Sequence, residues 1–292
     1  MPKLSSSPRL RALLFSLAIT AGLAFYAATS AETVLRVSLV PDEAPFVLRR
    51  KFMALSEYLE KKIGMKIEFR PSADANALID ALVANKLDMV WFSGFDFVRA
   101  QSRSDNQVIP IAQRAEDAQT RSVFITARND ITKFEDLAGK TFAFGEKSST
   151  SGHLMPRSFL RTAYVNPDVA MKHLIYSDSN MEVVTAVTGG IADAGVLSKA
   201  IWERMLASGE ADPKVLRVFH TTPGYHDYNW TVHTDMDSRL RQKLTDAFLS
   251  MDMRIGIEKE ILQVQRASKY ISTTPDNYST IEMVARSAGM LK

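Results

Sequence analysis

The chain has 292 residues, with 36 Lys and Arg against 33 Asp and Glu, 46% hydrophobic residues and no cysteine. The lack of cysteine excludes disulfides, thiolate chemistry and lipid attachment through a cysteine. The length allows one large domain or two lobes of ordinary size, and no basic block interleaved with aromatic residues indicates binding to nucleic acid.

The N-terminal segment, residues 1–31, has the features of an export signal. Lys3, Arg9 and Arg11 precede an uncharged, largely apolar stretch that runs from residue 12 to residue 28. Small residues follow, which predicts cleavage after Ala31. An uncleaved membrane anchor is the alternative, but a spanning helix usually needs roughly 20 apolar residues. Without this segment basic and acidic residues are equal in number, and we expect a soluble protein in the periplasm.

The first half of the mature chain alternates short β-branched runs with amphipathic stretches. We expect strands over residues 34–40, 67–69 and 87–92, with helices over 46–63 and 75–85. This is a βαβαβ pattern, and it favours a parallel sheet flanked by helices.

A second series of the same kind begins at residue 122. We expect strands over 122–126, 141–145, 172–176, 193–197, 215–220 and 230–234, and helices over 152–164, 183–188, 238–266 and 275–288. Two α/β halves predict two lobes, with a ligand cleft at the carboxyl ends of the strands. We assign lobe 1 to residues 32–121, lobe 2 to 122–237, and C-terminal helices that return to lobe 1 to 238–292.

The segment FGEKSSTSGHLMP places several hydroxyl groups between a predicted strand and a predicted helix. The candidate ligand-binding residues are Ser149, Thr150, Ser151, Gly152 and His153. Hydroxyls and free backbone N–H groups at a helix start form a neutral cradle for an oxyanion. The alternative is an ordinary helix cap, in which a single hydroxyl satisfies the helix.

Two aromatic segments supply further candidates. In WFSGFDF, Ser93 and the N–H of Gly94 could contact a ligand from the other lobe, with Phe92 as an apolar wall, whereas we expect Trp91 in the core. In YHDYNWTVH, residues 225–233, Asn229 and Trp230 are candidates because exposed Trp and Tyr tend to mark contact sites. The alternative is that this stretch packs between the lobes as a hinge cover.

Metal and catalytic constellations are absent from the sequence. The five His residues lack the spacing of a metal site, and STSGH differs from the G-x-S-x-G nucleophile elbow. We therefore expect no metal, no cofactor and no enzymatic activity.

Several motifs carry a resemblance to a known family. They are the run STSG at 149–152 with Pro156, the strand end at 91–94, ADAG at 192–195, and KFEDLAGKTFAFG at 133–145. The chain resembles the phosphonate and phosphite branch of the periplasmic solute-binding proteins of ABC importers. PDEAP at 41–45, VWFSGFDFV at 90–98 and YHDYNW resemble a sub-branch described as selenate-binding.

The resemblance implies a two-lobed type II binding protein with a hinge, an ABC permease in the inner membrane as partner, and a monomeric state. It assigns the oxyanion oxygens to Ser149, Thr150 and Ser151. Binders of aminophosphonates carry a His and an acidic residue where this chain has Asn180 and Met181, which predicts a ligand without an amine. The alternative is that Glu182, one residue farther along, supplies the carboxylate. A sensory subunit of a signalling system and an enzyme on the same fold remain the alternative functions.

Overall fold

The computed structural model describes residues 34–40, 45–72 and 74–291, so the predicted export signal and most of the PDEAP motif lie outside the described residues. Leu35–Lys292 forms one compact unit. Within the described ranges, no helix is long and apolar enough to cross a membrane.

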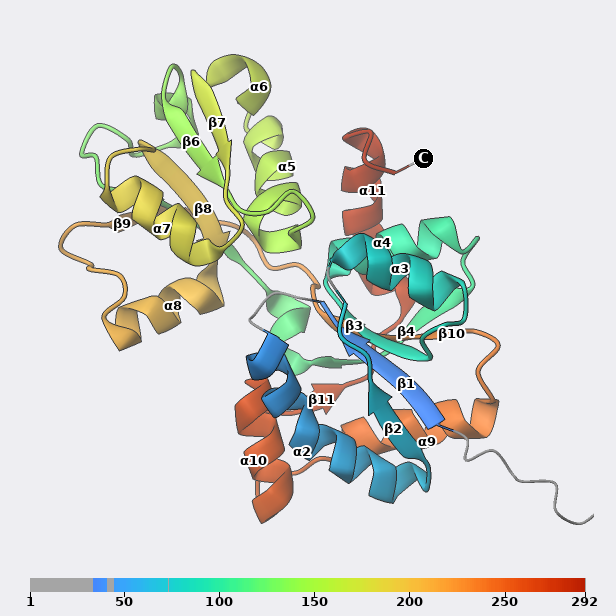
Figure 1. Ribbon diagram of the computed structural model, residues 1–292. Coiled ribbons are helices and arrows are strands. Elements are labelled where there is room, and N and C mark those ends of the chain that lie inside the picture. The colour runs from blue at the N-terminus through green and yellow to red at the C-terminus, as the bar shows by residue number, and fades with distance from the viewer. Residues whose placement is uncertain (1–33, 41–44, 73, 292) are drawn as a thin grey trace, which may run out of the picture. The chain divides into compact units, whose positions relative to one another are not determined.

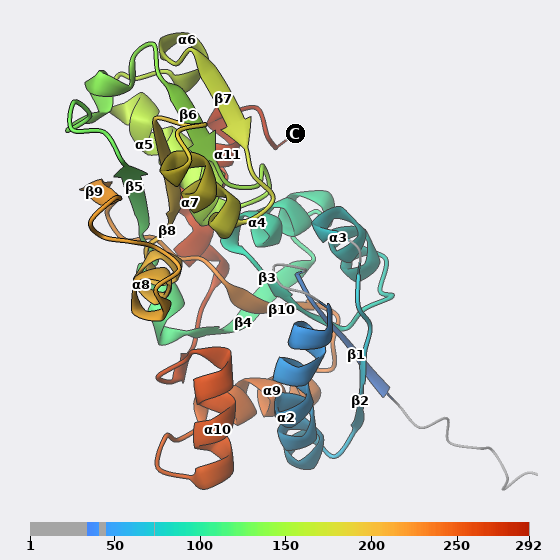
Figure 2. The same ribbon diagram turned by 60° about the vertical axis from the view of Figure 1, so that its left-hand side comes forward.

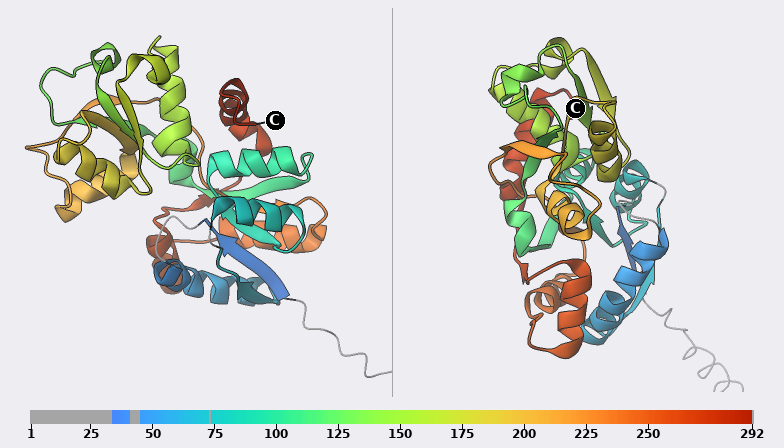
Figure 3. Two further views of the ribbon diagram at one scale, coloured as in Figure 1. Left: turned by 45° about the horizontal axis from the view of Figure 1, so that its top comes forward. Right: turned by 90° about the vertical axis from the view of Figure 1, so that its left-hand side faces the viewer.

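The first sheet has six strands in the order β11-β4-β10-β3-β1-β2 (Figure 1). Its strands are β1 (Val34–Leu39), β2 (Lys66–Phe69), β3 (Met89–Phe92), β4 (Val108–Arg114), β10 (Asn229–His233) and β11 (Tyr270–Ile271). Its helices are α2 (Pro45–Ile63), α3 (Ala75–Val83), α4 (Gly94–Arg103), α9 (Ser238–Leu249), α10 (Gly256–Gln265) and α11 (Ser279–Ser287), the last preceded by the short turn η4 (Pro275–Tyr278). α2 and α9 cover one face of the sheet, and α3 and α4 cover the other (Figure 3).

The second sheet has five strands in the order β7-β6-β8-β5-β9. Its strands are β5 (Ser122–Thr126), β6 (Thr141–Phe144), β7 (His173–Tyr176), β8 (Ala194–Ser198) and β9 (Arg217–Thr221). Its helices and short turns are η1 (Ala115–Gln119), η2 (Phe134–Leu137), η3 (Thr150–Leu154), α5 (Met155–Thr162), α6 (Pro167–Ala170), α7 (Asn180–Thr188) and α8 (Lys199–Ser208).

Alternate residues of β5 serve two separate cores, as expected for a strand that is buried on both faces. Val123 and Ile125 pack with the residues of α7 and α8, whereas Phe124 packs with Leu160 of α5. The helices therefore cover both faces of the second sheet (Figure 2).

The sheets differ from the parallel arrangement that the βαβ pattern predicted. β1 and β3 are parallel, as are β6 and its neighbours β7 and β8. However, β10 runs antiparallel to β3 and β4, and β5 runs antiparallel to β8 and β9. The prediction of parallel sheets was wrong for these strands, because a strand pattern shows burial and does not show the direction of the neighbouring strand.

The long helix predicted over residues 238–266 is two helices, α9 and α10, and the one predicted over 152–164 begins earlier and is divided into η3 and α5. α4 and α8 were not predicted. The start of α4 lies inside the aromatic run WFSGFDF, where the helical period is hidden because most of its side chains are buried.

The chain passes between the two sheets twice, at residues 115–121 and at residues 222–228. After the second crossing it enters β10, which pairs with β3 and β4 of the first sheet. The lobe 2 boundary predicted at residue 237 is therefore too late for this strand. Its pairing partners are distant in sequence, so the strand pattern alone could not assign it to a sheet.

Candidate functional site

The Ser/Thr loop follows directly after β6 and continues into η3, a turn of π-helix. Ser149 caps this turn by accepting a hydrogen bond from the N–H of Gly152 at 2.9 Å. The N–H of Gly145 donates to the carbonyl of Gly152 at 2.9 Å, which holds the turn against the end of the strand. The capping alternative therefore describes Ser149. Because Ser149 satisfies the cap, Thr150 is available for another partner.

Thr150 is the point at which three distant segments meet. Its hydroxyl oxygen accepts a hydrogen bond from the N–H of Phe95, at 3.0 Å, and the hydroxyl is also hydrogen-bonded to the carboxylate of Asp227. The side chain is buried. The Ser/Thr loop of the second sheet, the start of α4 and the segment before β10 thus converge at one hydroxyl group.

The start of α4 presents two backbone N–H groups to this point. Ser93 is the N-cap of the helix and accepts from the N–H of Asp96 at 3.2 Å, while its hydroxyl donates to the Asp96 carboxylate at 2.8 Å. With the cap satisfied, the N–H of Gly94 donates to Asp227 at 3.0 Å and that of Phe95 donates to Thr150. The positive end of the α4 dipole therefore faces the carboxylate of Asp227.

Asp227 is the residue of this site that the sequence analysis did not select. It is only 1% exposed. Burial raises the pKa of Asp227 to about 7, an effect that the hydrogen bond from Gly94 opposes and the charge of Asp117 reinforces. In the sequence, Asp227 is the single carboxylate within the aromatic run YHDYNW. An aromatic run of this kind tends to be buried, and Asp is rarely buried without a partner, so this pattern could have indicated a partnered Asp.

A backbone hydrogen bond joins the two chain crossings beside an ion pair of the first crossing. The Arg114 guanidinium donates to both carboxylate oxygens of Asp117, at 2.5 and 2.8 Å, and the Asp117 carbonyl accepts from the N–H of Asp227 at 2.9 Å. Arg114 also lies over the stacked rings of Trp91 and Tyr228, at 5.1 and 5.6 Å from their centroids. The backbone position of Asp227 is thus set by the first crossing.

Ser151 and His153 lie farther along η3. The carbonyl of Ser151 accepts from the hydroxyl of Ser122 at 2.7 Å. The Nδ1 atom of His153 is 3.0 Å from the carbonyl of Lys147, which makes Nδ1–H the donor, and the ring is edge-on to Tyr176. Burial lowers the pKa of His153, which favours the neutral imidazole. These contacts place His153 behind the loop, where it fixes the loop's shape, and a contact with ligand stays a prediction.

Phe92, Asn229 and Trp230 lie in the core of the first sheet. Phe92 and Asn229 face each other across β3 and β10, and both are completely buried. The Trp230 ring packs between the rings of Trp91 and Phe248, at 5.1 and 5.3 Å. The expectation that Trp91 belongs to the core is confirmed. No contact joins Phe92, Asn229 or Trp230 to Thr150 in the described part of the chain, so their role as ligand contacts stays a prediction.

The positions discussed for an aminophosphonate carboxylate lie at the start of α7. Glu182 accepts from the N–H of Asp178 at 2.9 Å, and its own N–H donates to the N-cap Ser179 at 3.2 Å, so both bonds hold the start of α7. Asn180 accepts from the N–H of Ser198 at 3.4 Å. Glu182 thus hydrogen-bonds within the start of α7 in this structure, and its role toward a ligand stays a prediction. Among the residues that the structure describes, no group of three His, Asp or Glu side chains could hold a metal ion.

The arrangement of Ser149–Gly152, the start of α4 and Asp227 is a buried polar centre between two α/β lobes. Residues 37–278 match the family described as "ABC transporter, phosphonate, periplasmic substrate-binding protein". The chain belongs to this family. It is therefore a periplasmic substrate-binding protein of an ABC transporter, a class that works with a membrane permease, and its relatives are transport proteins.

Similar proteins support both the family and the fold. A curated relative from Prochlorococcus marinus (strain MIT 9301), "Probable ABC transporter phosphite binding protein", is 30% identical over 275 residues, which cover 89% of this chain and 91% of the relative. A solved structure from the same organism, in complex with methylphosphonate, has a TM-score of 0.79 at 30% identity and covers 88% of this chain and 99% of that chain. A binding protein component of an ABC phosphonate transporter from Pseudomonas aeruginosa, at 20% identity, has a TM-score of 0.72 with 87% and 85% coverage and shares the fold. The two-lobed α/β fold predicted from the sequence is confirmed.

Proposed function

We propose that this binding protein captures phosphite or a small phosphonate in the periplasm and delivers it to the permease. The ligand oxygens are held by the hydroxyls of Ser149, Thr150 and Ser151, and the ligand replaces Asp227 as the acceptor of the N–H of Gly94. The related protein from Prochlorococcus marinus, whose solved structure contains methylphosphonate, supports this ligand class. The protein is exported as a monomer after cleavage near Ala31.

The observation that carries the choice of ligand is the buried carboxylate of Asp227 among the donors of the site. Asp227 already occupies the N–H of Gly94 and the hydroxyl of Thr150. A second anion next to a buried carboxylate is strongly repelled unless a proton is shared between the two. Phosphite and phosphonates retain an ionisable proton near neutral pH, whereas sulfate and selenate are fully deprotonated. The site therefore favours a phosphorus oxyanion over selenate.

Among the described residues, the site also offers no free carboxylate that would select a ligand with an amine. An ammonium group needs a carboxylate partner in the site, and Glu182 is committed to the cap of α7. Asp227 is the buried carboxylate at Thr150, and its partners already include Gly94 and Thr150. We therefore expect methylphosphonate to bind at least as tightly as 2-aminoethylphosphonate.

A thermal-shift and calorimetry panel on the mature protein tests the proposal, because a ligand that binds only the native state raises the melting temperature. The panel contains phosphite, methylphosphonate, 2-aminoethylphosphonate, phosphate, sulfate and selenate, each at pH 6, 7 and 8. Phosphite and methylphosphonate should raise the melting temperature, and sulfate and selenate should leave it unchanged. A larger shift with selenate than with methylphosphonate would overturn the assignment.

A further inference from the structure

The C-terminal helix α11 lies directly against the start of α4, where Gly94 presents its N–H to Asp227. A β-carbon added to Gly94 would lie 2.6 Å from the Cδ1 atom of Ile281. On the other side it would lie 3.3 Å from the Cα atom of Asp227 and 3.3 Å from the carbonyl oxygen of His226. Gly94 is therefore enclosed between α11 and the segment that carries Asp227.

α11 also packs against the Ser/Thr loop. Ile281, Val284 and Ala285 belong to the same buried apolar cluster as Leu154 and Met155, the residues that end η3 and begin α5. The same helix thus contacts both elements whose polar groups meet at Thr150.

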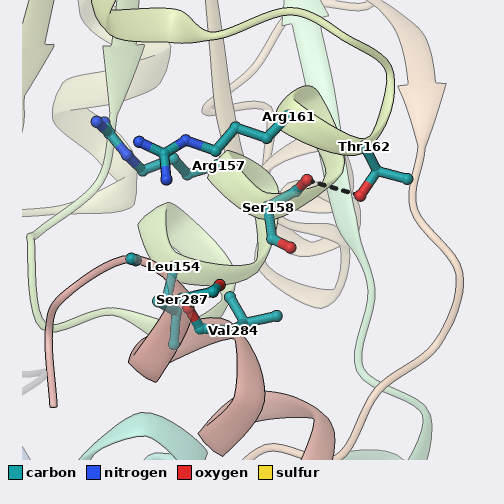
Figure 4. Close-up of a pocket in the computed structure, with 8 residues that line it drawn as sticks. Leu154, Arg157, Ser158, Arg161, Thr162, Val284 and Ser287 are labelled. Atoms are coloured by element: carbon teal, nitrogen blue, oxygen red, sulfur yellow. Dashed lines mark hydrogen bonds between the residues drawn. The ribbon is translucent and has the colours of Figure 1, made fainter.

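The contact between α11 and α5 is incomplete. A pocket of about 260 Å³ lies between them, lined by Leu154, Arg157, Ser158, Arg161, Thr162, Val284, Ser287 and Ala288. Leu154 and Ser158 point toward Val284 and Ser287, whereas the two arginines extend away from α11 (Figure 4). Arg157 and Arg161 share the single carboxylate of Asp168. The pocket thus lies beside the C-terminal half of α11, whereas Ile281 in the N-terminal half is buried.

The turn η4, directly before α11, is anchored to β4 and to the second chain crossing. The hydroxyl of Tyr278 donates to the side-chain carbonyl of Gln113 at 3.1 Å, and the Nδ1 atom of His226 lies 3.1 Å from the side-chain nitrogen of Gln113. The Tyr278 ring packs edge-on against Phe97 of α4, with centroids 4.8 Å apart. These contacts fix the position of Ile281 relative to Gly94 on one side and Asp227 on the other.

We propose that Ile281 is a positioning residue of the ligand site, and that α11 forms a third wall of that site. Ile281 presses on Gly94 from outside and keeps its N–H directed at Asp227. This inference rests on the proposed function, because it assigns Ile281 to the same oxyanion site. Close-packed contacts of this kind transmit small displacements, and a hydrogen bond weakens steeply when its geometry departs from linear.

The test is a mutant cycle between the glycine and the isoleucine, read by calorimetry with methylphosphonate. Gly94→Ala should weaken binding about tenfold or more, since the new methyl group collides with Ile281 and displaces the N–H. Ile281→Val removes the Cδ1 atom and should weaken binding about threefold in the wild-type background. The same substitution should strengthen binding of Gly94→Ala about threefold or more, because it removes the collision. Met283→Ala, an exposed residue of α11, serves as the control and should bind as the wild type does.

Ile281→Val should thus weaken binding in the wild type and strengthen it in Gly94→Ala. A general loss of stability would instead make the double variant bind more weakly than either single variant. A double variant that binds no better than Gly94→Ala would overturn the inference. If the wild-type protein binds no phosphorus oxyanion, the proposed function is wrong, and the inference is then tested without ligand. The melting temperatures of the ligand-free single and double variants replace the binding data. In that case Ile281→Val should raise the melting temperature of Gly94→Ala, and a further decrease would overturn the contact.

Discussion

At the residue scale, Asp227 decides both the charge of the site and its pH dependence. Burial raises the pKa of Asp227 to about 7, whereas an Asp in an unfolded chain titrates near pH 3.9. Between these two values the folded protein binds a proton that the unfolded chain has released. The free energy of unfolding therefore falls as the pH rises from about 4 to about 7. The carboxylate is retained in the site although it destabilises the fold at neutral pH, which is typical of a functional group.

Asp227→Asn should remove this pH-dependent loss. At pH 8 the ligand-free variant should melt a few degrees above the wild type, because the amide is neutral at every pH, and at pH 5 the two proteins should melt alike. The same variant should bind methylphosphonate about tenfold more weakly, since it cannot share the ligand's proton.

Asp130→Asn is the control for this comparison. Hydrogen bonds from Arg128 hold the pKa of the exposed Asp130 well below its usual range, so its neutralisation should give no gain at pH 8. Identical pH dependence of melting in Asp227→Asn and in the wild type would contradict the role assigned to Asp227.

At the scale of elements, the π-type turn η3 places the Ser/Thr loop, and Gly152 makes the turn possible. A β-carbon at Gly152 would lie 2.9 Å from the hydroxyl oxygen of Ser149 and 3.2 Å from the Cα atom of Gly145. Turns of π-helix occur frequently at functional sites. Here the turn brings the end of β6 into backbone contact with the loop, and this leaves no room for a side chain.

Gly152→Ala should lower the free energy of unfolding by about 1–3 kcal/mol, because the methyl group displaces the Ser149 cap and the end of β6. Binding of methylphosphonate should weaken together with stability, since Thr150 follows the displaced cap. Gly256→Ala is the matched control. It lies at the start of α10 with no heavy atom within 4 Å of the added β-carbon, so it should be neutral or slightly stabilising. Urea unfolding measures both effects, and equal stability of the two variants would contradict the tight turn.

At the scale of the whole molecule, the Arg114–Asp117 pair lies at the start of the first chain crossing, and Arg114 also contacts Tyr228 of the second crossing. Asp117 is buried and Arg114 is partly buried, and Arg114 additionally donates to the carbonyl of Gln265 at 2.9 Å. The pair therefore joins the end of β4, the first crossing and the end of α10, and through Tyr228 it also contacts the second crossing. Binding proteins of this class close by rotation about such crossings.

Arg114→Gln should lower the free energy of unfolding by about 3–5 kcal/mol, because Asp117 is left charged and buried without its partner. The double change Arg114→Met with Asp117→Leu should recover most of this loss, since neither charge remains. Arg36→Gln, which breaks a partly exposed pair with Asp88, should cost less and serves as the control. An Arg114→Gln variant as stable as Arg36→Gln would show that the buried pair does not hold the crossings.

Local patterns predicted most of the strands and the outline of the site. The strand at 122–126 was predicted with its observed bounds, because β-branched and aromatic residues in a short buried run leave few alternatives. The STSG run was selected as a cradle, and the structure places Thr150 of that run at the point where α4 and Asp227 meet. Phe92, Asn229 and Trp230 were selected for their aromatic surroundings, and the structure places them in the core.

The sequence by itself determined the family, the succession of strands and helices, and the hydroxyl loop, because each depends on residues that are neighbours in the chain. The tertiary structure alone decided three things: that β10 joins the first sheet, that Asp227 accepts from Gly94, and that Ile281 lies against that glycine. These contacts join residues more than a hundred positions apart. They depend on which surfaces pack together and on which buried polar groups form hydrogen bonds. A local pattern of residues predicts neither, because the partners are distant in the sequence.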